Sequence, residues 1–280
     1  MSDPDDYDLQ REYVEPPSAP VRSIGWWIAA AIATIAAAAG LYLTVGRQSA
    51  ETPAAPAPVA AREPPARSLG GEPEPVALPP LDESDAVVRT LVGALSKHPV
   101  VSAWLASDDL VRKFTAAVSN IAEGTSPAKQ LTALRPHAAF LVVEKDGKYF
   151  IDPRSYDRYA SVAGAVDSID PAGAAKLYAT LKPRIADAAG ELGLSADQFD
   201  RLLERAIVAL LGARIPDGPI QITPSAEGVG YDFVDGRLEG LSAGQKALVR
   251  MGPRNMRIIK AKLREIAVAL GVRPVQRPPD

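Results

Sequence analysis

The sequence predicts a mainly α-helical protein made of a single-pass transmembrane helix, a Pro/Ala-rich linker, and one helical domain with one or two small β-hairpins. Three observations support this fold class. An uncharged apolar run spans residues 24–45, a stretch rich in Pro and Ala follows it, and apolar residues recur at helical spacing from about residue 81. The predicted parts are an acidic N-terminal tail (1–23), the transmembrane helix (24–45), the linker (46–80), the helical domain (81–272) and a C-terminal tail (273–280).

The apolar run reads IGWWIAAAIATIAAAAGLYLTV and contains no charge between Arg22 and Arg47. Crossing a bilayer takes about 20 apolar residues, and Trp26, Trp27 and Tyr42 lie where interfacial aromatic residues are favoured. A cleaved signal peptide fits less well, because its apolar region would be only about 7–15 residues long and no convincing cleavage site follows. We therefore expect an uncleaved transmembrane helix.

The orientation of this helix depends on a nearly even count of flanking positive charges. Arg11 and Arg22 precede the span, whereas Arg47 and Arg62 follow it closely. The short tail and long C-terminal body are typical of a signal anchor, so we expect the tail in the cytoplasm and the body on the outer side of the membrane. A cytoplasmic body is the alternative. A stripe of small residues within the Ala-rich span would allow a homo-oligomer, and it consists of Gly25, Ala29, Ala33 and Ala37.

The segment after the span, ETPAAPAPVAAREPPARSLGGEPEPVALPP, contains almost no large apolar residues. Its Pro and Ala content predicts an extended, semi-rigid spacer that holds the following domain away from the membrane. The whole chain lacks Cys, which excludes disulfides, thiolate chemistry and lipid attachment through Cys.

The domain opens with apolar residues at helical spacing. Val87, Val88, Leu91 and Leu95 mark a first helix. Residues 110–121 form a second stripe, for which Ser107 is the expected N-cap and Gly124 the expected stop.

Two longer stripes lie in the second half of the domain. The stripe at 174–192 continues across Pro183, which predicts a kinked or split helix. The stripe at 199–211 is preceded by Ser195 and Gln198, the spacing of a capping box.

Two segments interrupt the helical pattern. FLVVEKDGKYFI places Asp146-Gly147 between two strand-like runs, a strong signal for a type I′ hairpin. PIQITPSAEGVGYDFVD predicts a second, looser hairpin around Gly228. Both are expected as small additions to the helical domain.

Catalytic chemistry has little support. The two histidines, His98 and His137, lack the spacing of a metal site or a Ser–His pair, and no nucleotide-binding or zinc-hydrolase motif is present. We therefore predict no catalytic residue, no metal and no cofactor.

DPRSYDRY, residues 152–159, is the most polar and aromatic cluster in the chain. An enzyme could use Asp152 or Asp157 as an acid–base group and Arg158 to bind an anion. We favour a structural interpretation, because Asp152 before Pro153 has the pattern of a helix N-cap followed by proline at the first helical position.

Positive charge is concentrated near the C-terminus of a chain whose net charge is −3. Residues 244–277 hold nine basic residues and one acidic residue. Gly252-Pro253 predicts a short helix at 242–251, opened by a capping box of Ser242 and Gln245, followed by a longer helix that ends near Leu270. Residues predicted to bind an anionic partner are Lys246, Arg250, Arg254, Arg257, Lys260 and Arg264. Internal pairing with Asp232, Asp235 and Glu239 is the competing explanation.

Several sequence segments of the C-terminal region resemble those of a known family. They are LPPLDESDAVV, RKFTAAVSNIAEG, DPRSYDRY, LEGLSAGQKALVRMGPRN and KAKLREI. The body is similar, over about residues 78–270, to an uncharacterised bacterial family of single-pass membrane proteins catalogued as a domain of unknown function. The resemblance implies the same layout of span, spacer and domain, and it implies no activity.

Together with this resemblance, the combined prediction is a single-pass protein of the bacterial inner membrane whose C-terminal domain lies in the periplasm. We expect this membrane-anchored envelope protein to act as a binding or scaffold module. Expected partners are the lipid bilayer and an unidentified envelope protein or anionic polymer, whereas nucleic acid is not expected. Two alternatives stay open. One is an enzyme that acts on cell-wall polymer through carboxylates, and the other is a cytoplasm-facing protein that binds an anionic ligand.

Overall fold

The computed structural model describes residues 68–226 and 230–273 of the 280-residue chain. Outside the described residues lie the predicted N-terminal tail at 1–23, the predicted span at 24–45 with its stripe of small residues, most of the linker, the tip of the second hairpin and residues 274–280 of the C-terminal tail. Within the described part, none of the helices combines the length and the apolar character needed to cross a bilayer.

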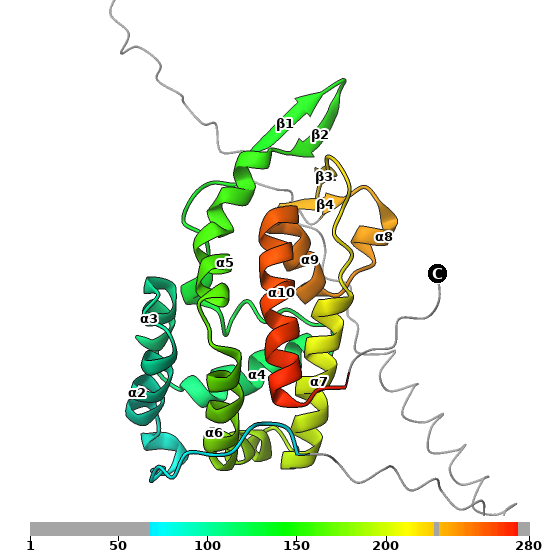
Figure 1. Cartoon of the computed structure of the whole chain (residues 1–280). Helices are drawn as coiled ribbons and strands as arrows, with labels where there is room; N and C mark the ends of the chain where they lie inside the picture. The colour runs from blue at the N-terminus through cyan, green and yellow to red at the C-terminus, as the bar shows by residue number, and fades with distance from the viewer. Residues whose placement is uncertain (1–67, 227–229, 274–280) are drawn as a thin grey trace, which may run out of the picture. The chain divides into compact units, whose positions relative to one another are not determined.

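Helices make up most of the described chain, as the sequence predicted, and a small antiparallel sheet accompanies them (Figure 1). The α-helices are α2 (Asp85–Leu95), α3 (Pro99–Leu105), α4 (Leu110–Ala122), α5 (Ala160–Asp167), α6 (Pro171–Glu191), α7 (Ala196–Gly212), α8 (Gly236–Glu239), α9 (Ala243–Arg250) and α10 (Gly252–Leu270). The 3₁₀-helices are η1 (Leu81–Glu83), η2 (Thr132–Leu134) and η3 (Pro153–Tyr159). The strands are β1 (Val142–Lys145), β2 (Lys148–Ile151), β3 (Gln221–Pro224) and β4 (Tyr231–Phe233).

Helix α10 is the element that ties the domain together. It packs against α5, α6, α7 and α9, and Figure 1 shows it between α5 and α6 on one side and α7 on the other. Its C-terminal half contributes Ala267 and Leu270 to a core shared with α2, α4, α6 and α7. Its N-terminal half contributes Met256 and Ile259 to a second core that lies under the sheet. One long helix therefore links two hydrophobic clusters.

Both predicted hairpins are present, and they join into one four-stranded sheet of order β1-β2-β3-β4. Asp146 and Gly147 have φ angles of 53° and 69°, which confirms the type I′ turn of the first hairpin. The two hairpins meet through β2 and β3, where Tyr149 lies opposite Ile222 and Phe150 opposite Gln221. The β1–β2 hairpin extends away from the helices (Figure 1).

The helix boundaries confirm most of the expected capping signals. The capping boxes of Ser195 with Gln198 and of Ser242 with Gln245 are both formed. Gly124, at a φ of 79°, follows the last residues of α4 as the predicted stop. Helix α6 continues through Pro183 without a break, so the helix is not split there.

The predicted N-cap of α4 is wrong. Asp109, not Ser107, precedes the helix, and its side chain caps no backbone group. The carboxylate of Asp85 on α2 instead accepts the N–H groups of Asp109 and Leu110, at 2.8 and 2.9 Å. The acceptor for the first N–H groups of α4 thus comes from a side chain 24 residues upstream. Short-range sequence patterns cannot reveal such a contact.

Residues that precede position 81 also pack against the helical domain. Residues 68–80, which we call the strap, lie along the helices although the sequence placed them in the linker. Leu69 is buried, Gly70 N–H donates to the carbonyl of Leu270 at 3.0 Å, and Gly71 N–H donates to Ala175 at 3.1 Å. Gly70 has a φ of 110°, and a Cβ there would lie 3.0 Å from the Cβ of Ala179, so the strap needs glycine at this point.

Candidate functional site

The start of α10 is built around Gly252, which turns the chain from α9 into α10 at a φ of 83°. A Cβ at this position would lie 2.3 Å from Cγ of Tyr156, so the tyrosine ring packs directly on the glycine. Pro253 follows at the start of the helix, and Gly271 ends it at a φ of 81°. These signals fix the length and direction of α10, as the sequence predicted.

Burial follows the helical period along α10. Met256 is completely buried, and Ile259 and Leu270 lie on the same inner side. The exposed positions fall on the opposite side of the helix, and they are Arg254, Arg257, Ala261, Arg264, Glu265 and Val268. The apolar and basic faces predicted for this helix are therefore both present.

Arg254, Arg257 and Arg264 form what we call the arginine face. All three are exposed, and none makes a hydrogen bond or ion pair with any residue that the structure describes. The acid among the exposed positions of α10, Glu265, is already paired with Lys262 at 2.7 Å. The positive charge of the arginine face therefore has no counterpart in the described part of the domain.

The expectation that Lys260 lies on this exposed face is wrong. Lys260 is 6% exposed, and its Nζ donates to the carbonyl oxygen of Ala213, just past the C-terminus of α7. The carbonyl groups at a helix C-terminus lack partners within the helix and carry partial negative charge. Lys260 therefore provides a hydrogen-bond donor to a carbonyl group at the end of α7.

The two basic residues of α9 also make internal contacts. Lys246 forms an ion pair with Glu239, and this ammonium partner lowers the pKa of the Glu239 carboxyl. Arg250 donates to the carbonyl of Tyr231 at 3.1 Å and lies 4.8 Å from the ring centroid of Phe233. The predicted internal pairing is thus present for Lys246 with Glu239, and Arg250 makes other internal contacts, but the arginine face is not explained in this way.

The DPRSYDRY segment forms η3, and Asp152 is its N-cap as predicted. The Asp152 carboxylate accepts from the N–H of Arg154 at 2.9 Å and from the Arg154 guanidinium at 2.5 Å. These contacts lower the pKa of Asp152 and keep it ionised. Arg158 lies over the rings of Phe140 and Tyr159, at 5.5 and 5.2 Å from their centroids.

Sequence reasoning did not foresee that η3 and the start of α10 meet. Buried Asn255 donates from Nδ2 to the carbonyls of Tyr156 and Met251, at 2.8 Å each. This side chain joins η3 to the start of α10, although Asn255 and Tyr156 are 99 positions apart in the sequence. A buried amide that bridges two backbone segments is a strong positional constraint.

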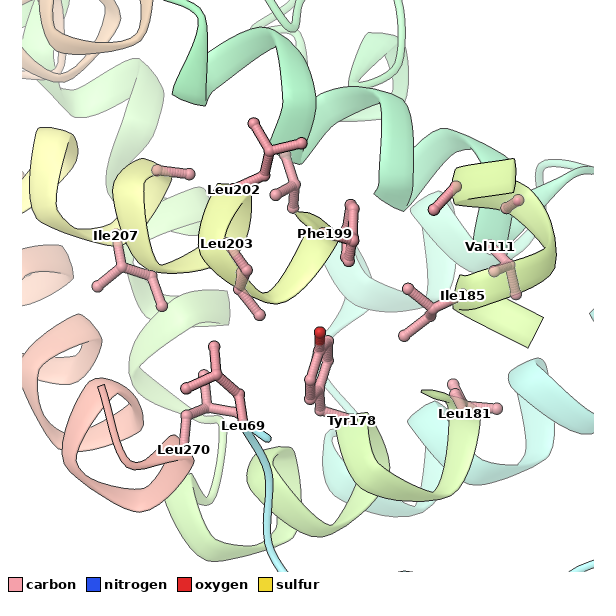
Figure 2. Packing of buried hydrophobic residues seen from close by; sticks show 14 of the residues in the cluster. Leu69, Val111, Tyr178, Leu181, Ile185, Phe199, Leu202, Leu203, Ile207 and Leu270 are labelled. Atoms are coloured by element: carbon pink, nitrogen blue, oxygen red, sulfur yellow. The ribbon is translucent and has the colours of Figure 1, made fainter. Parts of the chain in front are cut away.

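A second feature that the sequence analysis missed is a buried polar cluster around Asp200. Its carboxylate accepts from the hydroxyl of Tyr178 at 2.5 Å, from Nζ of Lys182 at 2.6 Å and from the N–H of Leu69 at 3.1 Å. Figure 2 shows Tyr178 pointing from α6 toward Phe199 and Leu203 of α7. Burial and the neighbouring carboxylate both raise the pKa of Tyr178.

The histidines do not converge on a site. His98 is the N-cap of α3, where its Nδ1 accepts from the N–H of Val100 at 3.2 Å. Among residues 68–226 and 230–273, no group of three His, Asp or Glu side chains is arranged to hold a metal ion.

A family model described as "Protein of unknown function (DUF3014)" matches residues 110–267, which is more than half of the chain. The matched region begins at the first residue of α4 and ends within the last turn of α10. It includes η3, the sheet and the arginine face, whereas the strap, α2 and α3 precede it. No curated protein and no solved structure matches the chain.

Proposed function

We propose that this chain, a member of the DUF3014 family of proteins of unknown function, is a membrane-anchored binding module whose arginine face holds an anionic partner. The observation that carries the proposal is the exposed charge of Arg254, Arg257 and Arg264, which lie on one side of a well-packed helix and have no partner among residues 68–226 and 230–273. Clustered like charge without internal partners attracts anions and repels itself, so it adds little to the stability of the fold.

Some other cationic side chains of the domain form ion pairs with carboxylates within it. Arg112 reaches Asp82, Asp109 and Glu191 at 2.6 to 3.0 Å. Lys182 reaches the buried carboxylate of Asp200. What distinguishes the arginine face is its clustering, because three arginines without a described partner lie within eleven consecutive positions of one helix, and this clustering supports a partner outside the domain.

The proposed location follows from the sequence. The apolar run at 24–45 anchors the chain in a bacterial inner membrane, and the body lies in the periplasm. The test is a fusion of alkaline phosphatase or a fluorescent protein after Asp280. Phosphatase activity supports a periplasmic body, whereas fluorescence without phosphatase activity contradicts it and favours a body in the cytoplasm.

Binding is tested with the full-length protein in detergent and fluorescently labelled polyglutamate as the anionic probe. We expect fluorescence anisotropy to report binding that weakens as NaCl increases, because exposed charges are screened over about 8 Å at physiological ionic strength. The double variant Arg257→Gln/Arg264→Gln should lose most of this binding. The matched control is Lys129→Gln/Arg135→Gln, which removes two exposed charges from the loop after α4. Equal loss in both variants would contradict a specific arginine face.

The enzymatic alternative gains no support from Asp152, because both of its carboxylate oxygens accept hydrogen bonds from Arg154. An acid–base catalyst needs an oxygen available to the substrate proton. We therefore propose no catalytic role for Asp152.

A further inference from the structure

We infer that the anionic partner is the headgroup surface of the same bilayer that anchors the chain. This inference rests on the proposed function and names the occupant of the arginine face. It starts from the position of the strap, which determines where the chain leading back to the predicted span leaves the domain.

The strap fixes this exit beside the C-terminal end of α10. Gly70 N–H donates to the carbonyl of Leu270, the last residue of α10. Leu69 N–H donates to the carboxylate of Asp200, and Nζ of Lys182 donates to Oγ of Ser68 at 2.7 Å. Figure 2 shows Leu69 close to Leu270 in the core. The membrane-proximal chain is thus held to the same helix that displays the arginine face.

The side chains around the arginine face match a lipid surface better than a purely acidic one. Arg257, Ala261, Arg264 and Val268 follow one another at intervals of four, three and four residues, so they lie on one side of α10. Val268 is 79% exposed, the highest value among the large apolar residues that the structure describes. Helices that lie on membranes combine basic residues for the phosphates with apolar residues that enter the acyl boundary.

Arginine also suits this surface chemically. Its planar guanidinium binds a phosphate through two parallel hydrogen bonds, and its long aliphatic stem can lie along apolar surface. An acidic protein partner would satisfy the charges, whereas a lipid surface would also bury the neighbouring exposed Val268. The lipid surface accounts for both features with one occupant.

The length of the tether allows this contact. The 22 residues numbered 46–67 separate the predicted span from the strap. A chain of this length spans at most about 75 Å when it is fully extended. Helix α10, with 19 residues, is about 28 Å long at 1.5 Å per residue. The helix can therefore lie along the bilayer while the strap stays in place.

Tethering makes a modest attraction sufficient. Three arginines at an anionic surface would bind a free domain only weakly, with roughly fivefold in affinity for each charge. A linked domain experiences an effective concentration in the millimolar range, so a weak contact is still substantially populated. We expect the face to touch the membrane reversibly and to detach when salt screens its charge.

The test uses the complete chain in lipid nanodiscs and exploits the absence of Cys. A nitroxide is attached at Ala261→Cys, in the centre of the face, and at Ala128→Cys, an exposed control in the loop after α4. Its accessibility to oxygen, which concentrates in lipid, is compared with its accessibility to a water-soluble nickel complex. Discs contain either 30% phosphatidylglycerol or phosphatidylcholine alone.

We expect lipid-like accessibility at position 261 in the anionic discs only, with position 128 remaining water-accessible in both. Adding 0.5 M NaCl should abolish the contact, and Arg257→Gln/Arg264→Gln should lower the ratio of bound to free domain about 25-fold. Water-like accessibility at 261 in the anionic discs, or no difference between the lipids, would overturn the inference. If the polyglutamate experiment still depends on the same arginines, the proposed function stands and the partner is an acidic protein or polymer. Loss of that dependence would remove the proposed function itself.

Discussion

Replacing Asp200 by Asn is expected to loosen the strap from the helices and to lower the stability of the whole domain. The carboxylate lies at a buried junction where α6, α7 and the strap meet, and it accepts hydrogen bonds from Tyr178, Lys182 and Leu69. Asn has nearly the same shape, so the substitution removes charge and one acceptor oxygen without creating a large cavity. The carboxylate binds the strap directly through the N–H of Leu69, so we expect the strap to respond first.

The size of the effect follows from the partners. Hydrogen bonds to a charged group contribute about 1.5–3 kcal/mol each, and losing one partner of a buried ion pair costs about 3–5 kcal/mol. The side chain of Lys182 is 23% exposed and that of Asp200 is 4% exposed, so water can still solvate the ammonium after the change. We therefore expect a loss of about 2–4 kcal/mol, below the full cost of breaking a buried pair. For a domain of this size that corresponds to a decrease in Tm of about 5–15 °C.

The assay combines thermal unfolding with hydrogen exchange at the amides of Leu69 and Gly70. The variant Asp200→Asn should melt earlier, and both amides should exchange faster than in the unmodified protein at a temperature where the helices remain folded. Asp217→Asn, at an exposed loop position, is the matched control and should change neither measurement. A Tm within about 2 °C of the original, together with unchanged protection of Leu69, would refute the role assigned to Asp200.

Three further outcomes are expected. Gly252→Ala should destabilise the domain by about 2–4 kcal/mol, because it combines an unfavourable positive φ with a collision against a tyrosine ring. Gly190→Ala, in an open helical position, should stabilise the domain by about 0.5–1 kcal/mol. Urea unfolding would contradict this reasoning if both variants changed the free energy of unfolding in the same direction. Lys260→Ala should cost about 2 kcal/mol or more and Arg257→Ala less than about 0.5 kcal/mol, and equal Tm values would contradict the different burial of these side chains. Acidification from about pH 5 to pH 3 should lower the free energy of unfolding. An ammonium partner lowers the pKa of Glu239 in the folded protein, and the stability that the ionised carboxylate contributes is lost when Glu239 is protonated. An equally large decrease in the variant Glu239→Gln would show that this group does not contribute.

Local signals in the sequence were sufficient for most of the helical domain. The capping boxes at Ser195 and Ser242, the Asp146-Gly147 turn and the glycine at the end of α10 each act over a few residues, so they could be recognised without a structure. The helical period of α10 also separated its apolar side from its arginines. The same spacing placed Arg254, Arg257 and Arg264 together, and the structure shows all three exposed.

Long-range contacts explain what sequence reasoning missed. Lys260 lies at the edge between the two faces of α10, and only the position of α7 decides that it is buried. The strap was interpreted as linker because its composition is poor in large apolar residues, yet Leu69 and a series of backbone hydrogen bonds hold it in place. The charge on Asp200, among the apolar residues of α7, was the one available hint of the buried cluster. Such a residue needs a partner that the sequence alone does not identify.

The most direct test of the central claim is to measure whether the arginine face is covered in its native membrane. Full-length protein is treated with an arginine-specific dicarbonyl reagent, once in isolated membranes and once in detergent, and adducts at individual arginines are quantified by mass spectrometry. We predict that Arg254, Arg257 and Arg264 react in detergent but are protected in membranes, that high salt removes the protection, and that exposed Arg135 and Arg237 react equally in both settings. Equal reactivity of the three arginines in membranes and in detergent would contradict the claim that this face binds an anionic partner.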